Sequence, residues 1–385
     1  MAGNRSAIRK NLSQKIALIL IAAVWAALAA LPFAVVGNNA YGDAYAANGA
    51  QSYIVLEKTT KRVLSDSNAD ARLPMASTTK VMTALIAIEK GNPADTVTIS
   101  GEAVGIEGSS IYLKKGEKFT LEELLYGLML RSGNDAATAI ALHVGGSVEN
   151  FVKMMNDRAE SMGLKNTSFA NPHGLSAKNH YTSAYDLAVI AATALENDLF
   201  KKIVSTKNVT VPGNEFRETR YFANKNKLLY NYSGATGVKI GFTTEAGRCL
   251  VASSEREGME VVAVALNYYD YFDKCAALMD YAYDNYRMER VVSPDFVYKT
   301  VKVEGNRKIK SADLKTLSAK YYPIKKDGSE KVSRVVEAPD NISAPHKGSD
   351  AVGKVKVFLG NRLLFEENLY TIDIEKKGIF SLFGK

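Results

Sequence analysis

The spacing of apolar positions changes character along this chain. Residues 16–36 are almost wholly apolar, whereas residues 51–290 mix short apolar runs with longer runs of helical period. Beyond residue 291, apolar and polar positions alternate with a period of two in several stretches. The pattern predicts an N-terminal targeting segment, a mixed domain and a β-rich domain.

The N-terminal segment has the features of a secretory signal peptide. Residues 5–15 carry four basic side chains, an apolar stretch of 21 residues follows, and Ala44-Tyr45-Ala46 forms a small-x-small cleavage pattern. We expect residues 1–46 to be removed and the protein to be exported to the cell envelope, at the outer face of the cytoplasmic membrane or in the cell wall. An uncleaved anchor is the alternative, because such a stretch is long enough to span a bilayer.

Residues 47–290 are predicted to form an α+β domain. Short apolar runs predict strands at 51–56, 62–64, 237–242, 248–253 and 260–266. Helical patterns occur at 77–90, 121–130, 135–144, 148–162, 184–194 and 272–286, and Thr120 with Glu123 predicts a capping box for the second of these. Because strands open and close the domain, we expect an antiparallel sheet whose first and last strands pair, with flanking helices and a helical subdomain.

Residues 291–375 are predicted to form a small β-rich domain. Alternating patterns predict strands at 299–303, 354–357, 362–364 and 370–374. Residues 376–385 form a short apolar and basic tail, which is too short to span a membrane and either touches its surface or is a frayed end.

The net charge of +8 is concentrated in the C-terminal part of the chain. Residues 291–385 hold 18 basic and 12 acidic side chains, whereas residues 47–290 hold 27 and 28. A basic second domain suits peripheral contact with an anionic membrane or envelope surface, and a solvated basic face explains it equally well. No basic groove interleaved with aromatic residues points to nucleic acid.

The two cysteines, Cys249 and Cys275, do not form the framework of a disulfide-rich protein. A single bridge is possible in an exported protein if the helix carrying Cys275 packs on the strand carrying Cys249. Two independent buried thiols are the interpretation that we favour.

The most informative chemical pattern is the pair Ser77 and Lys80. These residues stand three positions apart at the start of a helical run, so both side chains lie on one face within hydrogen-bonding reach. A lysine amine beside a serine hydroxyl can take its proton and make the oxygen a nucleophile.

Three downstream residues supply the other groups that acyl transfer needs. Ser132, in Ser132-Gly133-Asn134, offers a second hydroxyl near a leaving group, and Lys239, in Lys239-Ile240-Gly241, offers a cation for an anionic substrate. Asn134 can hydrogen-bond a substrate amide, and Gly241 lets a substrate backbone approach the strand edge.

The order Ser-x-x-Lys, Ser-x-Asn, Lys-x-Gly resembles the signature of β-lactamases and penicillin-binding proteins. Other segments are similar to the low-molecular-mass D-alanyl-D-alanine carboxypeptidases, namely residues 132–147, 162–164, 171–175, 241–247 and, more loosely, 344–348. The resemblance implies a β-lactamase/transpeptidase-like catalytic domain followed by the family's β-rich domain.

The resemblance also implies a substrate and a mechanism. Ser77 attacks the penultimate D-Ala carbonyl of a peptidoglycan stem pentapeptide, Lys80 is the base, and Ser132 relays a proton to the departing D-Ala. The residues expected to bind substrate are Asn134, Lys239, Gly241, Phe242 and Thr243, and the backbone N–H groups of Ser77 and Phe242 are expected to form the oxyanion hole. β-Lactam antibiotics are expected to acylate Ser77.

No metal or organic cofactor is expected. The four histidines, His143, His173, His180 and His346, lack the spacing of a zinc peptidase.

One residue departs from the family pattern, since Ile240 stands where the family has threonine in Lys-Thr-Gly. By the resemblance, that hydroxyl contacts the substrate's terminal carboxylate. A hydrogen bond to a charged group contributes about 1.5–3 kcal/mol, so its absence corresponds to recognition that is about 10- to 150-fold weaker. We expect reduced or retuned activity, with Thr243, Lys225 or Arg248 as other partners for the carboxylate.

Two alternative functions stay open from the sequence. A class A β-lactamase needs glutamate in an E-x-x-L-N setting, and the nearest match, residues 196–199, continues with Phe200 and is interpreted as chance. The second alternative is a catalytically weakened penicillin-binding protein with a structural or regulatory wall-binding role, in which Ile240 is the lesion.

Overall fold

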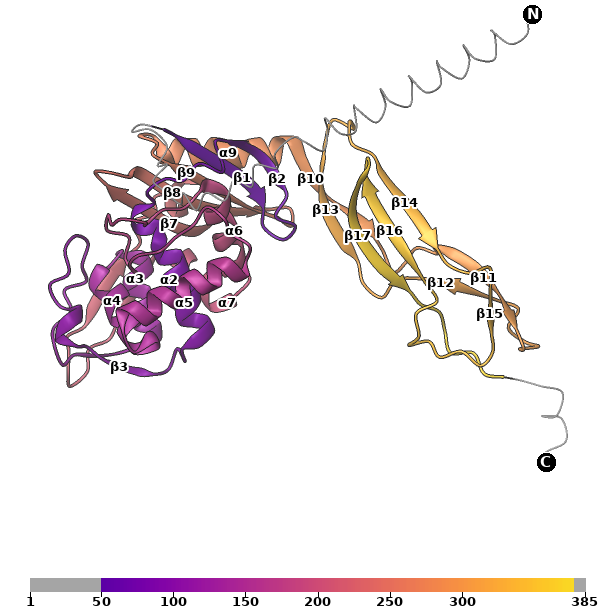
Figure 1. Cartoon of the computed structure of the whole chain (residues 1–385), viewed down its shortest axis with the longest axis horizontal. Helices are drawn as coiled ribbons and strands as arrows, with labels where there is room; N and C mark the ends of the chain where they lie inside the picture. The colour runs from indigo at the N-terminus through magenta and orange to yellow at the C-terminus, as the bar shows by residue number, and fades with distance from the viewer. Residues whose placement is uncertain (1–49, 377–385) are drawn as a thin grey trace, which may run out of the picture. The chain divides into compact units, whose positions relative to one another are not determined.

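The first domain is built on a five-stranded antiparallel sheet (Figure 1). Its strands are β1 (Ser52–Glu57), β2 (Val63–Ser67), β7 (Ala235–Thr243), β8 (Gly247–Arg256) and β9 (Met259–Leu266). The order is β2-β1-β9-β8-β7, so β1 pairs with β9 and the predicted meeting of the first and last strands is confirmed. Strand β7 is an edge strand, which leaves one side of it open to a ligand.

The computed structural model describes residues 50–376, so the predicted signal peptide and the apolar part of the tail lie outside the described residues. Within residues 50–376, no helix has the length and apolar character needed to cross a membrane.

Helices cover both faces of the sheet (Figure 1). They are η1 (Ala76–Thr79), α2 (Lys80–Lys90), η2 (Gly101–Ala103), α3 (Leu121–Leu130), α4 (Asn134–Gly145), α5 (Val148–Ser161), α6 (Ala184–Ala194), α7 (Asp198–Ser205), α8 (Leu228–Asn231) and α9 (Tyr271–Asn285). The long helices match the predicted ranges closely, and the capping box of Thr120 and Glu123 is present. Helix α7 was not predicted, although Asn197 marks its start by accepting hydrogen bonds from the N–H groups of Leu199 and Phe200.

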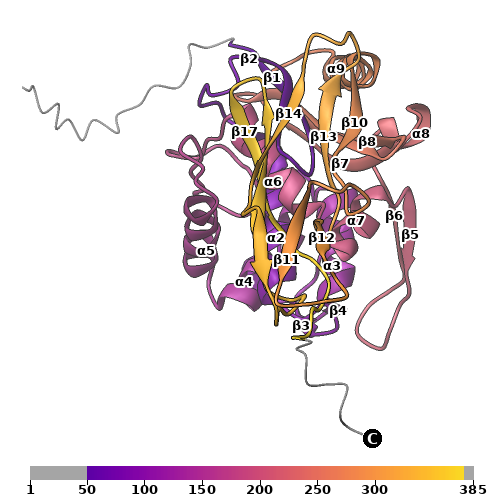
Figure 2. The ribbon, with the colours of Figure 1, turned by 90° about the vertical axis from the view of Figure 1, so that its right-hand side faces the viewer.

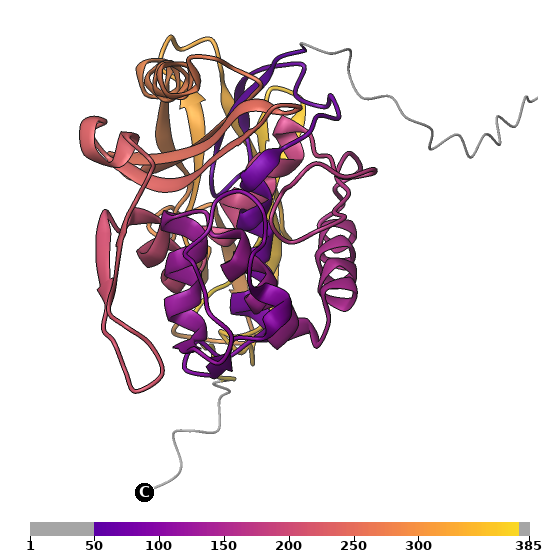
Figure 3. The same ribbon diagram turned by 90° about the vertical axis from the view of Figure 1, so that its left-hand side faces the viewer.

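Two short hairpins complete the helical subdomain, and the sequence pattern predicts neither. One pairs β3 (Thr96–Thr98) with β4 (Lys118–Thr120), and the other pairs β5 (Asn208–Val211) with β6 (Arg220–Ala223). In Figure 2, α5 and the β5–β6 hairpin flank the central helices on opposite sides, and Figure 3 shows the same hairpin from the other direction. Strands of three or four residues are too short to show a period.

The sheet separates two apolar clusters because successive side chains on a strand point to opposite faces. Val251 and Val264 join the cluster formed with α2, α3, α4 and α6. Leu250 and Ala263, one position earlier on the same strands, join the cluster formed with α9. The face on which a residue of β8 from Cys249 to Ala252 lies can therefore be read from its number.

This separation decides the state of the two cysteines. Cys249 lies in the cluster beneath the helical subdomain, and Cys275 lies in the α9 cluster on the other side of the sheet. Both thiols are free and buried, which confirms the favoured interpretation. Burial raises the pKa of Cys249 to about 12 and also raises the pKa of Cys275.

The second domain is β-rich, as predicted. Its strands are β10 (Tyr286–Val292), β11 (Lys299–Glu304), β12 (Ser311–Leu314), β13 (Lys320–Lys325), β14 (Val332–Glu337), β15 (Asn341–Ser343), β16 (Gly353–Leu359) and β17 (Arg362–Leu369). They form small sheets of order β10-β13, β12-β11-β15 and β14-β16-β17 around a separate apolar cluster. Strand β10 spans position 290, where the sequence pattern places the domain boundary.

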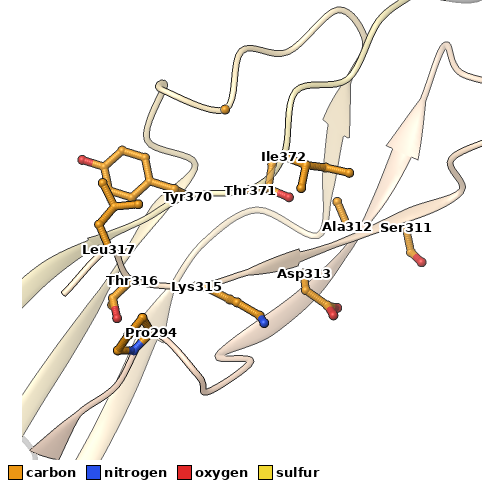
Figure 4. Close-up of a pocket in the computed structure, with 11 residues that line it drawn as sticks. Pro294, Ser311, Ala312, Asp313, Lys315, Thr316, Leu317, Tyr370, Thr371 and Ile372 are labelled. Carbon is orange, nitrogen blue, oxygen red and sulfur yellow. The ribbon is translucent and has the colours of Figure 1, made fainter. Parts of the chain in front are cut away.

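The strand predicted at 370–374 is wrong. Tyr370 bridges to Lys315 while Ile374 bridges to His346, so this segment exchanges single bridges with two different partners. A cavity of about 570 Å³ lies beside it, lined by β12 and by Leu317, Tyr370, Thr371 and Ile372 (Figure 4). The cavity shares no residue with the candidate catalytic groups.

Because both thiols are buried on opposite faces, native protein is expected to resist alkylation by iodoacetamide at neutral pH. After unfolding without reductant, mass spectrometry is expected to find two alkylated cysteines. Recovery of a peptide that links Cys249 to Cys275 would contradict this placement.

Candidate active site

The pair Ser77 and Lys80 is brought together by a tight turn. Ser77 lies in the 3-10 helix η1, which leads directly into α2 at Lys80. Side chains three positions apart eclipse one another in a 3-10 helix, so the serine and lysine face each other more directly than in an α-helix. The Lys80 Nζ lies 3.0 Å from the Ser77 Oγ.

Two further oxygen atoms surround the Lys80 amine. It donates to the Asn134 Oδ1 at 2.7 Å and to the backbone carbonyl of His173. Both groups only accept hydrogen bonds, so they take both N–H bonds of a neutral amine. The remaining lone pair is then directed at the Ser77 hydroxyl, which is the arrangement that a general base needs.

The surroundings of Lys80 favour its neutral form. Burial and then the positive charge of Lys239 hold the pKa of Lys80 well below its usual value, while Asp135 acts in the opposite direction. The Asp135 carboxylate also accepts hydrogen bonds from the N–H groups of Ile111 and Leu113. These hydrogen bonds hold the loop that contains Ile111 and Leu113 against the start of α4.

Ser132 lies in the turn between α3 and α4, and Asn134 is the first residue of α4. Ser132 is buried and has a φ of +64°, a left-handed conformation that a non-glycine residue adopts at some energetic cost. The Asn134 amide, expected to bind substrate, instead bridges Lys80 and the Glu107 carbonyl. In this structure its contacts orient the base.

Strand β7 presents alternate residues to the Ser77 side. Lys239 and Gly241 lie on that side, and the Lys239 amine is buried and donates to the Ile240 carbonyl at 2.9 Å. Burial, with a smaller contribution from the charge of Lys225, lowers the pKa of Lys239 to about 7. Thr243 lies on the same side, and its hydroxyl accepts a hydrogen bond from the Ala246 N–H in the β7–β8 turn.

A second structural constraint, besides the approach of a substrate backbone, requires glycine at position 241. A Cβ atom at this position would lie 3.2 Å from both the Ala76 Cβ and the Ser77 N. The absence of a side chain therefore allows β7 to pack directly against the nucleophile turn. This contact brings the Ser77 N–H next to the edge of β7.

Ile240 does not face Ser77. Its side chain packs with the α9 cluster, and its cross-strand partner Leu250 belongs to the same cluster. Phe242 lies on this face as well and is 65% exposed. The substitution of isoleucine for threonine therefore removes no group from the side of β7 that carries Lys239.

The two cations proposed for the substrate carboxylate are placed differently. Lys225 is close enough to Lys239 for its charge to lower the Lys239 pKa, and partial burial and then the charge of Arg131 lower the pKa of Lys225 itself. Arg248 lies opposite Phe242 and stacks on the rings of Tyr269 and Tyr271. Lys225 is thus the cation whose charge lowers the pKa of both Lys239 and Lys80.

The sequence does not reveal that the 170–175 loop contacts Lys80. The His173 carbonyl contacts Lys80, the Thr83 hydroxyl donates to the Pro172 carbonyl at 2.6 Å, and the Gly174 backbone packs on Ala76. In the sequence, segment 171–175 shows only a resemblance to the family. Backbone carbonyls have no residue signature, so only the fold reveals this contact.

Two other acidic residues lie outside the catalytic contacts. Glu196 is in the turn between α6 and α7 and pairs with Lys61 near the surface. Asp186 is buried and accepts hydrogen bonds from the Asn166 N–H and the Thr167 hydroxyl, which gives it a structural role. Neither contacts Lys80 or Ser77.

Comparison with known proteins agrees with this site. A family model described as D-alanyl-D-alanine carboxypeptidase matches residues 40–269, and one described as penicillin-binding protein 5, C-terminal domain, matches residues 286–376. D-alanyl-D-alanine carboxypeptidase DacF of Bacillus subtilis is 34% identical over 349 residues, covering 88% of this chain and 89% of the relative. The structure of penicillin binding protein 5 from Haemophilus influenzae superposes with a TM-score of 0.69 at 28% identity, covering 86% of this chain and 99% of that one.

The chain therefore belongs to the D-alanyl-D-alanine carboxypeptidase family, with the β-rich C-terminal domain of penicillin-binding protein 5. It is a serine-type D-Ala-D-Ala carboxypeptidase that acts on peptidoglycan.

The different surroundings of Lys225 and Arg248 lead to a matched prediction. Lys225→Met is expected to lower kcat/KM for a D-Ala-D-Ala peptide by about 10- to 150-fold, because one charged hydrogen bond to the carboxylate is lost. Arg248→Met is expected to change it by less than about threefold. Steady-state assays of D-Ala release check both variants, and the reverse ranking would assign the carboxylate to Arg248.

Proposed function

We propose that this carboxypeptidase removes the terminal D-Ala from peptidoglycan stem pentapeptides through an acyl-enzyme on Ser77. The observation that carries the proposal is the surroundings of the buried Lys80 amine. Two acceptors occupy its N–H bonds and leave the lone pair for the Ser77 hydroxyl. Chemistry of this kind needs no metal or organic cofactor.

Acylation proceeds by transfer of the Ser77 proton to Lys80 as Oγ attacks the carbonyl carbon of the penultimate D-Ala. The backbone N–H groups of Ser77 and Phe242 stabilise the oxyanion, and the loss of one such donor typically costs about 10²–10³ in rate. The proton then passes through Ser132 to the amine of the leaving D-Ala. The C–N bond breaks, and an ester on Ser77 remains.

Deacylation uses the same groups in reverse order. Lys80 is neutral again after the proton has left with D-Ala, so it can accept a proton from the water that attacks the ester. The proton then passes to the Ser77 Oγ as the ester C–O bond breaks, which releases the shortened peptide and restores the Ser77 hydroxyl. A β-lactam follows the first step, but its leaving amine stays tethered to the acyl group. We therefore expect penicillin to label Ser77.

Substrate recognition rests on the cations beside β7. Lys239 and Lys225 attract the terminal carboxylate, and the edge of β7 at Gly241, Phe242 and Thr243 pairs with the peptide backbone. Asn134 contributes by holding Lys80 and can also meet the substrate amide.

The location follows from the substrate, because carboxypeptidases of this family act on the cell wall outside the cytoplasm. We further propose export through the segment 1–46 and peripheral contact of the basic C-terminal domain with the envelope or membrane surface. The excess of basic over acidic side chains in residues 291–385 supports that contact.

A weakened, wall-binding role is the second candidate, and Ile240 is the residue that favours it. The position of Ile240 on the α9 side of β7 argues against a lesion among the groups that surround Ser77. A β-lactamase role has less support, since Glu196 is exposed and paired with Lys61.

Purified protein is expected to release D-Ala from a pentapeptide ending in D-Ala-D-Ala, and Ser77→Ala is expected to lose at least about 10³-fold in rate. Released D-Ala and penicillin labelling are measured on the same samples, with Ile240→Thr as a comparison. Labelling without D-Ala release by the native protein, together with release by Ile240→Thr, would favour the weakened role. Rapid turnover of penicillin would favour the β-lactamase.

The pKa of Lys239 predicts the alkaline side of the pH profile. Its pKa is lowered to about 7, so the amine is charged below that pH and loses its charge as the pH rises. We expect kcat/KM, which reports the free enzyme, to fall above about pH 7. Lys239→Met should have a lower kcat/KM that lacks this fall, and persistence of the fall in the variant would assign it to another group.

A further inference from the structure

His180 links the nucleophile turn to the loop that holds the catalytic lysine. Its imidazole is buried, with the Nε2 atom 2.8 Å from the Thr79 Oγ1 and the Nδ1 atom 3.0 Å from the Ala170 N. A backbone N–H can only donate, so Nδ1 accepts and the ring proton resides on Nε2. The Nε2–H then donates to the Thr79 hydroxyl, which in turn donates to the Ala76 carbonyl at 2.8 Å.

The ring is held in its neutral form. Burial, with smaller contributions from His173 and Lys80, lowers the pKa of His180 to about 3. The single tautomer that its partners select is therefore maintained at any pH at which the enzyme works. Each member of the chain of hydrogen bonds has a defined direction.

Both ends of this series of hydrogen bonds lie next to residues that contact the Ser77–Lys80 pair. Ala76 and Thr79 belong to η1 and flank Ser77. Ala170 begins the loop whose His173 carbonyl accepts from the Lys80 amine. No described contact connects His180 itself to Ser77 or Lys80, so any influence it has on them must pass through these neighbours.

We propose that His180 is a positioning residue, which fixes the His173 carbonyl relative to the nucleophile turn and thereby keeps the Lys80 lone pair on Ser77. The inference rests on the proposed roles of Ser77 and Lys80. If the link is broken, the carbonyl shifts, one N–H of Lys80 loses its acceptor, and the amine rotates. A displacement of about 1 Å in such a site typically costs about 10²-fold in rate.

Substrate binding depends on other groups, so the effect has a distinctive signature. Lys239 and Lys225 lie on β7 and after β6, and no described hydrogen bond joins them to His180. Loss of the link should therefore lower kcat and the rate of acylation by penicillin with little change in KM. A merely destabilised protein would instead show a smaller active fraction with unchanged constants per active site.

The test uses variants that keep or remove one hydrogen bond at a time. Thr79→Val removes the hydroxyl with little change in volume, and Thr79→Ser restores it. His180→Gln offers an amide near the position of Nε2, and His180→Asn offers one near that of Nδ1. His143, a partly exposed histidine paired with Asp95, supplies the control His143→Gln.

The expected result is a fall of about 10- to 100-fold in kcat and in the acylation rate constant for Thr79→Val and His180→Asn, with KM within about threefold of the native value. Thr79→Ser and His143→Gln should stay within about threefold of native, and combining Thr79→Val with His180→Asn should cost no more than the worse single change. Rates are normalised to the sites that labelled penicillin titrates, so partial misfolding does not imitate the effect.

Native-like acylation in Thr79→Val would overturn the inference, as would additive losses in the double variant. Equal losses in Thr79→Ser and Thr79→Val would also overturn it. Absence of a penicillin adduct on Ser77 in the native protein would instead refute the proposed mechanism itself.

Discussion

The buried amine of Lys80 is the constraint on which the rest of the site depends. A neutral amine has two hydrogens and one lone pair, and the fold supplies two acceptors and one hydroxyl for them. An uncompensated ammonium group would be costly at this depth, so burial favours the form that can act as a base. The turn before α4 and the 170–175 loop both serve to deliver those acceptors.

The charges of Lys239 and Lys225 act on this amine and outweigh the opposing effect of Asp135 on its pKa. Lys239 lowers the Lys80 pKa, Lys225 lowers the Lys239 pKa, and the Asp135 carboxylate is occupied by backbone N–H groups of the neighbouring loop. Such a site has an electrostatic field suited to an anionic ligand. The terminal carboxylate of a D-Ala-D-Ala peptide is an anion of that kind, and in the proposed function its binding offsets the repulsion between Lys239 and Lys225.

The two faces of edge strand β7 have different roles. Gly241 packs against the nucleophile turn and Lys239 lies close enough to Lys80 to lower its pKa, whereas Ile240 packs on the α9 side. Ile240, the residue that departs from the family pattern, therefore lies on the face of β7 that packs against the α9 cluster. The same division of the sheet keeps Cys249 and Cys275 apart, because Cys249 on β8 lies on the first face and Cys275 belongs to α9, which covers the other face.

Much of this protein follows from local sequence. The α+β domain, the β-rich domain, the capping box at Thr120 and the candidate site residues Ser77, Lys80, Ser132 and Lys239 are all marked by period, spacing or motif. These signals are local because helix and strand periods, and the eclipsed serine–lysine pair, involve residues close together in the chain. The short hairpins and the false strand at 370–374 lie where the segments are too short for a period to decide.

Only the tertiary structure decided which groups hold the base and which face each residue of β7 serves. The His173 carbonyl has no residue signature, and its approach to Lys80 joins positions 93 residues apart. The contact of Asn134, a predicted substrate ligand, with Lys80 is likewise set by packing. Sequence determines the chemistry that is available, and the packing of distant segments determines which atoms can use it.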